Sequence, residues 1–126
     1  MSAAARIVKP GGLIILACEC RDGVPQGSPY EALLRSGSSS EAILQGLLQA
    51  PHPVAEQWQA QIQTLIQRQA TVKVFSTLPD DTVRACHLEP CGDIRQEVHA
   101  WLGRAGPQAR VAVLPEGPLT IPYLAK

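Results

Sequence analysis

Leu13-Ile14-Ile15-Leu16-Ala17-Cys18 is an unbroken apolar run that directly follows the turn sequence Lys9-Pro10-Gly11-Gly12. A short run with a turn signal in front and a polar loop behind is typical of a strand buried on both faces of a parallel sheet. In open α/β sheets, ligands bind just beyond the carboxyl ends of such strands. We therefore expect a functional edge at the segment Cys18-Glu19-Cys20-Arg21-Asp22-Gly23.

The longer segments of the chain alternate between helix and strand patterns. Residues 54–68 and 93–104 carry apolar side chains at helical spacing, whereas residues 71–76 and 110–114 alternate and are rich in valine. Strands separated by helices predict right-handed βαβ crossovers and a parallel sheet. The predicted fold is one α/β domain over residues 1–126, a three-layer, mainly parallel sheet with helices on both faces and Rossmann-like crossovers.

Shorter signals place the remaining elements. The Ala-rich residues 2–8 suit a helix, and Ser38 with Glu41 has the spacing of a capping box for a further helix. Pro79-Asp80-Asp81 opens a short helix, with proline in the first turn and acids near the positive helix end. Cys86-His87-Leu88 is ambiguous and is consistent with a short strand.

Composition excludes several classes of partner. The chain is 45% hydrophobic and 17% charged, and its eleven basic and eleven acidic side chains cancel. This balance predicts a folded domain without a footprint for nucleic acid or for a membrane surface. Its apolar runs are far shorter than the roughly 18 residues that span a bilayer. Because Pro10-Gly11-Gly12 also interrupts any signal-peptide pattern, we expect a cytoplasmic protein.

The four cysteines, Cys18, Cys20, Cys86 and Cys91, are expected to be free thiols. Their C-x-C and C-x4-C spacings differ from the paired C-x2-C pattern of structural zinc sites, so no metal site is predicted. A minor alternative is that Cys86, His87 and Cys91 converge on a metal ion.

No self-contained catalytic set is visible. The three histidines are dispersed, and Gly11-Gly12 precedes the first strand, which is the wrong end for a phosphate-binding loop. Glu19 and Asp22 are either ligand contacts or solvated loop residues. Trp58 lies on the apolar stripe of the 54–68 helix with Val54, Ile62, Leu65 and Ile66, where periodicity favours a core position over a contact.

Three segments together resemble a known family. They are residues 2–23, which end in Glu19-Cys20-Arg21-Asp22-Gly23, then Glu56-Gln57-Trp58-Gln59-Ala60-Gln61-Ile62, and finally residues 110–122, which include Leu114-Pro115-Glu116-Gly117-Pro118. In this order and spacing they resemble the C-terminal domain of the lactate racemase family (LarA-like, nickel-pincer-nucleotide-dependent). The resemblance spans almost the whole chain, but only the last part of a full-length family member.

The resemblance implies a function in racemising or epimerising small 2-hydroxy acids. In the family, a nickel-pincer nucleotide accepts and returns a hydride, two histidines act as bases, and a lysine tethers the cofactor. These groups belong to an N-terminal cofactor domain. The resemblance therefore implies a cleft-closing domain that has no catalytic residue, is inactive alone, and works with that domain in cis or as a separate chain.

One family residue carries over with a role. Trp58 matches the tryptophan that closes over the substrate, while Glu19 and Cys20 match the loop after the first strand without an assigned role. Two alternatives remain. The chain is a stand-alone α/β binding or partner module without catalysis, or it is a Cys/His metal-binding protein.

Overall fold

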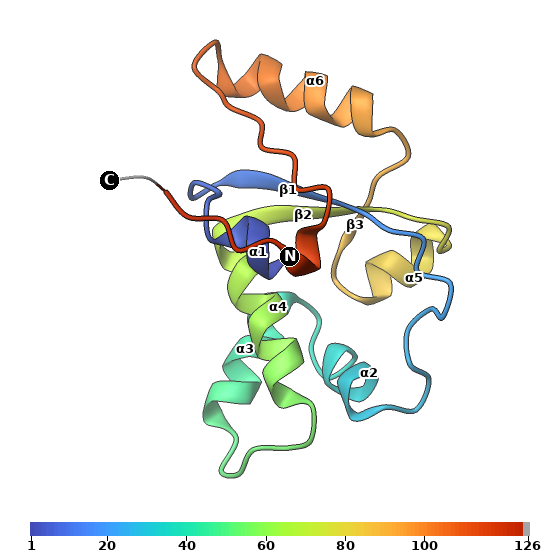
Figure 1. Cartoon of the computed structure of the whole chain (residues 1–126). Coiled ribbons are helices and arrows are strands. Elements are labelled where there is room, and N and C mark those ends of the chain that lie inside the picture. Colours follow the sequence, from blue (N-terminus) through green and yellow to red (C-terminus); the bar gives the residue numbers. More distant parts are fainter. Residues whose placement is uncertain (125–126) are drawn as a thin grey trace.

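The computed structural model describes residues 1–124 and shows a small parallel sheet between helices (Figure 1). In chain order the elements are α1 (Ser2–Ala5), β1 (Gly12–Ala17), α2 (Pro29–Leu34), α3 (Ser40–Gln49), α4 (Gln57–Gln69), β2 (Ala70–Phe75), α5 (Asp80–Ala85), β3 (Glu89–Pro90), α6 (Ile94–Ala105) and the 3-10 turn η1 (Gly117–Leu119).

The described sheet has three parallel strands in the order β1-β2-β3. Gly12 pairs with Ala70 and Ala17 with Phe75, so β1 and β2 are in register over their full length. The predicted parallel α/β sheet is confirmed. The expectation that β1 is buried on both faces is wrong, because β2 takes the central place and β1 alternates between buried and partly exposed residues.

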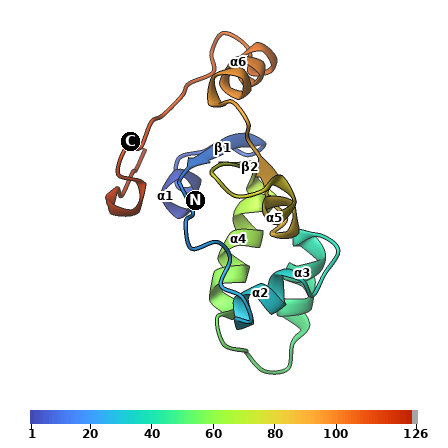
Figure 2. The same cartoon turned by 90° about the vertical axis from the view of Figure 1, so that its right-hand side faces the viewer.

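Helices lie on both faces of the sheet, as predicted (Figures 1 and 2). On one face, α1, α4 and α5 cover the strands, and on the other face α6 lies across them. Lys73 of β2 reaches α6, with its Nζ 2.8 Å from Glu97 Oε2 and 3.5 Å from Glu89 Oε2. The hydrogen bond that Lys73 donates to Glu97 raises the pKa of Lys73, which keeps this link charged. Since α6 has no fully buried residue, this ion pair is a main tie between α6 and the sheet.

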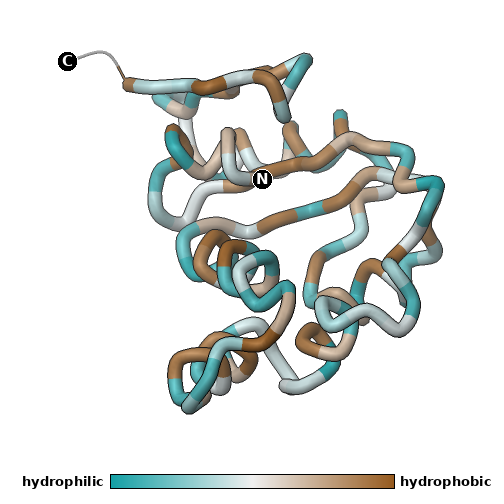
Figure 3. The backbone as a smooth tube through the Cα atoms, turned by 60° about the horizontal axis from the view of Figure 1, so that its bottom comes forward, coloured by the Kyte–Doolittle hydropathy of each residue, from teal (hydrophilic) through white to brown (hydrophobic). Residues whose placement is uncertain are grey.

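The apolar interior divides into two clusters that α4 connects. One joins the sheet to the end of α4 through Ile14, Val72 and Ile66, and the other packs Ile43 and Leu47 of α3 on Ala60, near the start of α4. Figure 3 shows the strands as mainly hydrophobic and the helices as alternating. The start of α4 therefore packs on α3, and only the end of α4 packs on the sheet.

The predicted strand at residues 110–114 is wrong. This segment is extended but pairs with no strand of the described sheet, and Val111 and Val113 are 55% and 78% exposed. Figure 2 shows the chain after α6 passing beside the sheet until η1 lies next to α1. A valine-rich, alternating pattern indicates that a segment suits a β-sheet, but it does not guarantee that a neighbouring strand is available for pairing.

Several element boundaries also differ from expectation. The third strand is Glu89–Pro90 and not residues 86–88, because Cys86 ends α5 and His87 has a left-handed φ of 57°. Ser39 caps α3 in place of Ser38, accepting a hydrogen bond from the Ala42 N–H at 3.1 Å. The first helix ends at Ala5, three residues before the predicted end. Within residues 1–124, no helix has the length and hydrophobicity needed to cross a membrane.

Candidate functional site

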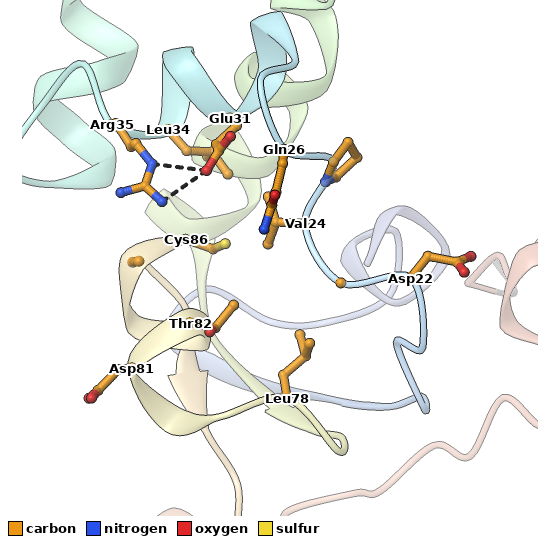
Figure 4. Close-up of a pocket in the computed structure, with 13 residues that line it drawn as sticks. Asp22, Val24, Gln26, Glu31, Leu34, Arg35, Leu78, Asp81, Thr82 and Cys86 are labelled. Atoms are coloured by element: carbon orange, nitrogen blue, oxygen red, sulfur yellow. Dashed lines mark hydrogen bonds and ion pairs between the residues drawn. The ribbon is translucent and has the colours of Figure 1, made fainter.

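A cavity of about 710 Å³ opens at the carboxyl edge of the sheet (Figure 4). Three segments form its walls: the loop after β1, the helix α2, and the α5 region after β2. Its lining residues are Asp22, Gly23, Val24, Pro25, Gln26, Glu31, Leu34, Arg35, Leu78, Asp81, Thr82, Ala85 and Cys86.

Strand direction explains the place of this cavity. Because β1 and β2 are parallel neighbours, the segments that follow them leave the sheet at the same edge. The loop after β1 and the helix α5 after β2 therefore face each other. Pro79 precedes α5, and Asp80 and Asp81 occupy its first turn, where negative charge stabilises the helix start. The expected functional edge beyond β1 thus coincides with a cavity.

The α2 wall begins at a defined helix cap. Ser28 Oγ accepts a hydrogen bond from the Glu31 N–H at 3.1 Å, and Pro29 occupies the first turn. Glu31 in turn accepts from the Gly27 N–H at 2.8 Å and from Arg35 Nη2 at 2.9 Å. These donors lower the pKa of Glu31, so the carboxylate stays charged and is compensated by Arg35.

Two partly buried hydrogen bonds through Gln63 hold the α2 and α5 walls together. The Tyr30 hydroxyl donates to Gln63 Oε1 at 2.6 Å, and Gln63 Nε2 donates to the Cys86 carbonyl oxygen at 2.7 Å. Gln63 lies on α4 and is only 2% exposed. We call Tyr30, Gln63 and Cys86 the polar bridge. It connects α2 and the end of α5, the two helical walls of the cavity, through α4.

His87 is a structural residue. A ring nitrogen, Nε2, lies 2.8 Å from the Leu34 carbonyl oxygen, and the backbone carbonyl of His87 accepts a hydrogen bond from Gln67 Nε2. Both contacts tie the turn after α5 to α2 and α4. The histidine closest in sequence to the cavity is therefore engaged in holding its walls.

The lining of the cavity suits the binding of a ligand or another surface, and it does not combine a reactive nucleophile with a histidine base. In Figure 4 the Cys86 thiol and Val24 face the interior, whereas Asp22 and Asp81 point away from its rim. Burial raises the pKa of Cys86, so its sulfur is a neutral thiol and a poor nucleophile. No histidine lines the cavity. Among residues 1–124, no three His, Cys, Asp or Glu side chains converge as metal ligands, and Cys86, His87 and Cys91 form no such group.

The predicted loop residues lie beside this cavity. Glu19 and Cys20 do not line it, whereas Asp22 and Gly23 of the same loop do. The Glu19 carboxylate pairs with Arg21 at 2.7 Å, and the Glu19 backbone oxygen accepts from the Thr77 hydroxyl at 2.8 Å. Glu19 thus anchors the loop to the segment after β2.

Trp58 lies elsewhere, at the start of α4, and its side chain is 64% exposed. The predicted buried face of residues 54–68 is wrong for four of its five members, since Ile62 and Leu65 are also 40% and 45% exposed, and Val54, which precedes α4, is 51% exposed. The helix instead buries Ala60, Gln63, Thr64 and Ile66. Polar Gln63 and Thr64 can be buried because the polar bridge and the Ala60 carbonyl satisfy them.

Three of the exposed residues of α4 are large and apolar and share one face of the helix. Trp58, Ile62 and Leu65 occupy positions i, i+4 and i+7 of one helix face, and we call them the α4 stripe. Beside it lies a shallow groove of about 360 Å³, which Ile62 and Leu65 share with Ala5 and Arg6. The α4 stripe and the cavity share no lining residue. The start of α4, which carries Trp58, also lies apart from the end of β1, after which Glu19 and Cys20 follow (Figure 1).

Sequence reasoning missed the α2 and α5 walls, namely Glu31, Arg35, Thr82 and Cys86. A usable signal existed, because Pro79-Asp80-Asp81 predicted a helix directly after the second strand. Parallel neighbours place such a helix next to the loop that follows the first strand. The α2 wall carried a weaker signal, the Ser28-Pro29 helix start.

The polar bridge makes stability depend on pH in the alkaline range. Burial raises the pKa of Tyr30 from its ordinary value of 10.0 to about 12. The folded protein then holds this proton more tightly than the unfolded chain, so the contribution of Tyr30 is complete below pH 10 and is lost as pH rises towards 12. We expect the melting temperature of Tyr30→Phe to fall less steeply over this range than that of wild type. Tyr123→Phe, at a residue that is 85% exposed, should retain the wild-type slope, and equal slopes for all three proteins would contradict the burial of Tyr30.

Comparison with known proteins identifies the family. The family model described as the lactate racemase C-terminal domain matches residues 1–121. The solved lactate racemase apoprotein from Thermoanaerobacterium thermosaccharolyticum superposes with a TM-score of 0.80 at 21% sequence identity, covering 100% of this chain and 30% of that one. No curated protein sequence matches the chain. The resemblance expected from the three motifs is confirmed, and the chain belongs to the lactate racemase C-terminal domain family.

Proposed function

We propose that this chain is the cleft-closing domain of a lactate-racemase-like enzyme that racemises or epimerises small 2-hydroxy acids. The observation that carries the proposal is the exposed Trp58 at the head of the α4 stripe. A tryptophan that is 64% exposed, next to two further apolar residues of the same helix face, is typical of a surface that another domain covers.

In this proposal the α4 stripe faces an N-terminal cofactor domain. The chain matches only 30% of the solved racemase, which leaves room in such an enzyme for a further domain. Ile62 and Leu65 supply the apolar contact, and Trp58 reaches past it towards the substrate. The Trp58 indole offers an apolar wall and an N–H donor. Both suit a lid over a small hydroxy acid in a cleft that excludes water.

The nickel-pincer nucleotide does not fit the described residues of this chain as its holder. Cys86 in the cavity is a neutral thiol, Arg35 is paired with Glu31, and no cluster of three metal-ligating side chains forms within residues 1–124. The proposal therefore assigns the cofactor, the two bases and the lysine tether to the N-terminal domain. The predicted domain, residues 1–126, is then inactive alone. Its free thiols agree with a cytoplasmic enzyme.

The test is Trp58→Ala in the holoenzyme that contains this domain and its cofactor domain. We expect kcat/KM for lactate racemisation to fall about tenfold or more, which corresponds to about 1.4 kcal/mol of lost transition-state stabilisation. Trp58→Phe, which keeps the apolar wall and loses the N–H, should fall between wild type and alanine. The purified chain alone should show no racemisation.

The matched control is Leu48→Ala, which truncates an apolar side chain of α3 that is 59% exposed and lies outside the α4 stripe. It should leave kcat/KM unchanged, and thermal unfolding should show that both variants remain folded. Unchanged activity of a folded Trp58→Ala enzyme would remove Trp58 from the substrate site.

The self-contained cavity supports a second candidate, a stand-alone α/β binding module. Its walls come entirely from this chain, and Asp22 and Asp81 are among its lining residues, although their carboxylates point outward (Figure 4). This candidate requires the chain to act without a cofactor domain. Activity of the holoenzyme that depends on Trp58 would therefore decide against it.

A further inference from the structure

The loop after β1 places two thiols in direct contact. The Sγ atoms of Cys18 and Cys20 lie 3.2 Å apart. Cys18 is exposed and Cys20 is partly exposed, so small molecules can reach the pair. Within the described part of the chain, Cys86 and Cys91 make no such thiol–thiol contact.

Backbone hydrogen bonds hold this loop in place. The Cys18 N–H donates to the Phe75 carbonyl at 3.0 Å, the Glu19 carbonyl accepts from the Thr77 hydroxyl at 2.8 Å, and the Gly23 N–H donates to the Cys20 carbonyl at 3.0 Å. Cys20 itself has a left-handed φ of 53°, a conformation that few non-glycine residues adopt. The convergence of the two sulfurs is therefore built into the backbone around them.

The step from this contact to a bond is short. A disulfide has an S–S distance of about 2.05 Å, so the sulfurs must approach by roughly 1.2 Å from their 3.2 Å separation. One residue between the cysteines makes a small ring, and exposed or strained disulfides are the readily reduced ones that serve regulation. A disulfide between Cys18 and Cys20 would therefore be readily reversible, unlike a structural disulfide.

We propose that Cys18 and Cys20 form a redox-active dithiol that closes to an internal disulfide by exchange with a low-molecular-weight disulfide such as oxidised glutathione. The Cys20 thiolate attacks one sulfur of the oxidant, which forms a mixed disulfide and releases one glutathione thiolate. The Cys18 sulfur, after giving its proton to water, attacks the Cys20 sulfur and expels the second glutathione. The dithiol loses two electrons and two protons, and one oxidised glutathione becomes two reduced molecules.

The electrostatics of the pair support this order of events. Partial burial, followed by the hydrogen bond and charge of the neighbouring Cys20, raises the pKa of Cys18 to about 11. Because Cys18 holds its proton more tightly than an ordinary thiol, we assign the first attack to Cys20. Once Cys20 is bound in a mixed disulfide it carries no charge, so part of the cause that raises the pKa of Cys18 disappears and the second step becomes easier.

Closure of the disulfide changes the loop that forms one cavity wall. The hydrogen bond from Gly23 to Cys20 links the dithiol directly to Asp22 and Gly23, both of which line the cavity. The oxidation state of the loop then sets the shape of that wall. This inference stands independently of the proposed racemase function, because it requires only this chain.

The test exposes the purified protein to graded mixtures of reduced and oxidised glutathione, followed by acid quenching, alkylation and mass spectrometry of the peptides. We expect wild type to lose two thiols and to gain a Cys18–Cys20 disulfide without retained glutathione. Cys18→Ser should instead accumulate a Cys20–glutathione adduct to at least tenfold the level in wild type. Reduced glutathione should restore both thiols in wild type.

The control is the double variant Cys86→Ser/Cys91→Ser, which should form the same disulfide as wild type. Thermal unfolding verifies that Cys18→Ser, altered in an exposed loop, remains folded. A lasting glutathione adduct on wild type would overturn the proposal, as would two unmodified thiols in the most oxidising mixture or oxidation that starts at Cys86.

Discussion

Gln63→Ala is expected to lower the free energy of unfolding by about 3 kcal/mol, through loss of two buried hydrogen bonds and a small cavity left by the side chain. Gln63 is 2% exposed and joins the Tyr30 hydroxyl to the Cys86 carbonyl at 2.6 and 2.7 Å. Alanine leaves both groups without a partner away from water. Chemical denaturation monitored by circular dichroism measures the change.

The matched control is Gln45→Ala on α3. Gln45 is exposed and hydrogen bonds only to Glu41 of its own helix at 2.9 Å, so its loss should change the free energy of unfolding by less than about 0.5 kcal/mol. Tyr30→Phe should cost less stability in the Gln63→Ala background than in wild type, since the shared bond is already absent. Equal costs for Gln63→Ala and Gln45→Ala would show that the polar bridge adds nothing to stability.

In the proposed enzyme, Leu65→Lys is expected to weaken association with the N-terminal cofactor domain about a hundredfold or more. Leu65 belongs to the α4 stripe, and a lysine there would bring an unpaired charge into an apolar interface, at about 3 kcal/mol. Lysine is preferable to aspartate because Arg6 lines the same groove and would neutralise a carboxylate. Calorimetry of the two separately purified domains measures the affinity.

The control for this variant is Leu48→Lys on α3. Leu48 and Leu65 are both exposed leucines on helices, at 59% and 45%, but only Leu65 lies on the α4 stripe. Leu48→Lys should retain the wild-type affinity, and melting temperatures should show that both variants fold. Unimpaired association of folded Leu65→Lys would mean that the cofactor domain docks on another face.

The sheet and the edge that carries the cavity were predictable because their signals are local. Gly11-Gly12 followed by an apolar run starts β1, and the alternation around Val72 and Val74 defines β2. Parallel pairing then follows from the helices between them. The position of the cavity beyond β1 needed no side-chain detail.

The buried face of α4 was not predictable from its sequence alone. Its two possible faces compete: one is apolar through Trp58, Ile62 and Leu65, and the other contains Gln63 and Thr64. Periodicity selects the apolar face for the core. The fold reverses this choice because Tyr30 and Cys86, distant in sequence, satisfy Gln63. When one helix carries both an apolar face and a satisfiable polar face, periodicity alone cannot tell which of them is buried.

The strand pattern of residues 110–114 failed for a related reason. Val111 and Val113 have the side chains of a strand but no neighbouring backbone within the described sheet. Strand propensity depends on the surface that receives the side chains. The sequence shows that these residues suit a β-sheet, but it does not show whether a neighbouring strand is available to pair with them.

The polar bridge couples the position of α4 to the walls of the cavity. Gln63 faces inward towards Tyr30 and Cys86, while its direct neighbour in the chain, Ile62, lies on the outward-facing α4 stripe. Because both residues belong to one helix, any rotation of α4 that moved Ile62 would also move Gln63. Because its hydrogen bonds reach α2 and the end of α5, that rotation pulls on two walls of the cavity together. α4 thus links the α4 stripe to the walls of the cavity, although the stripe and the cavity share no lining residue.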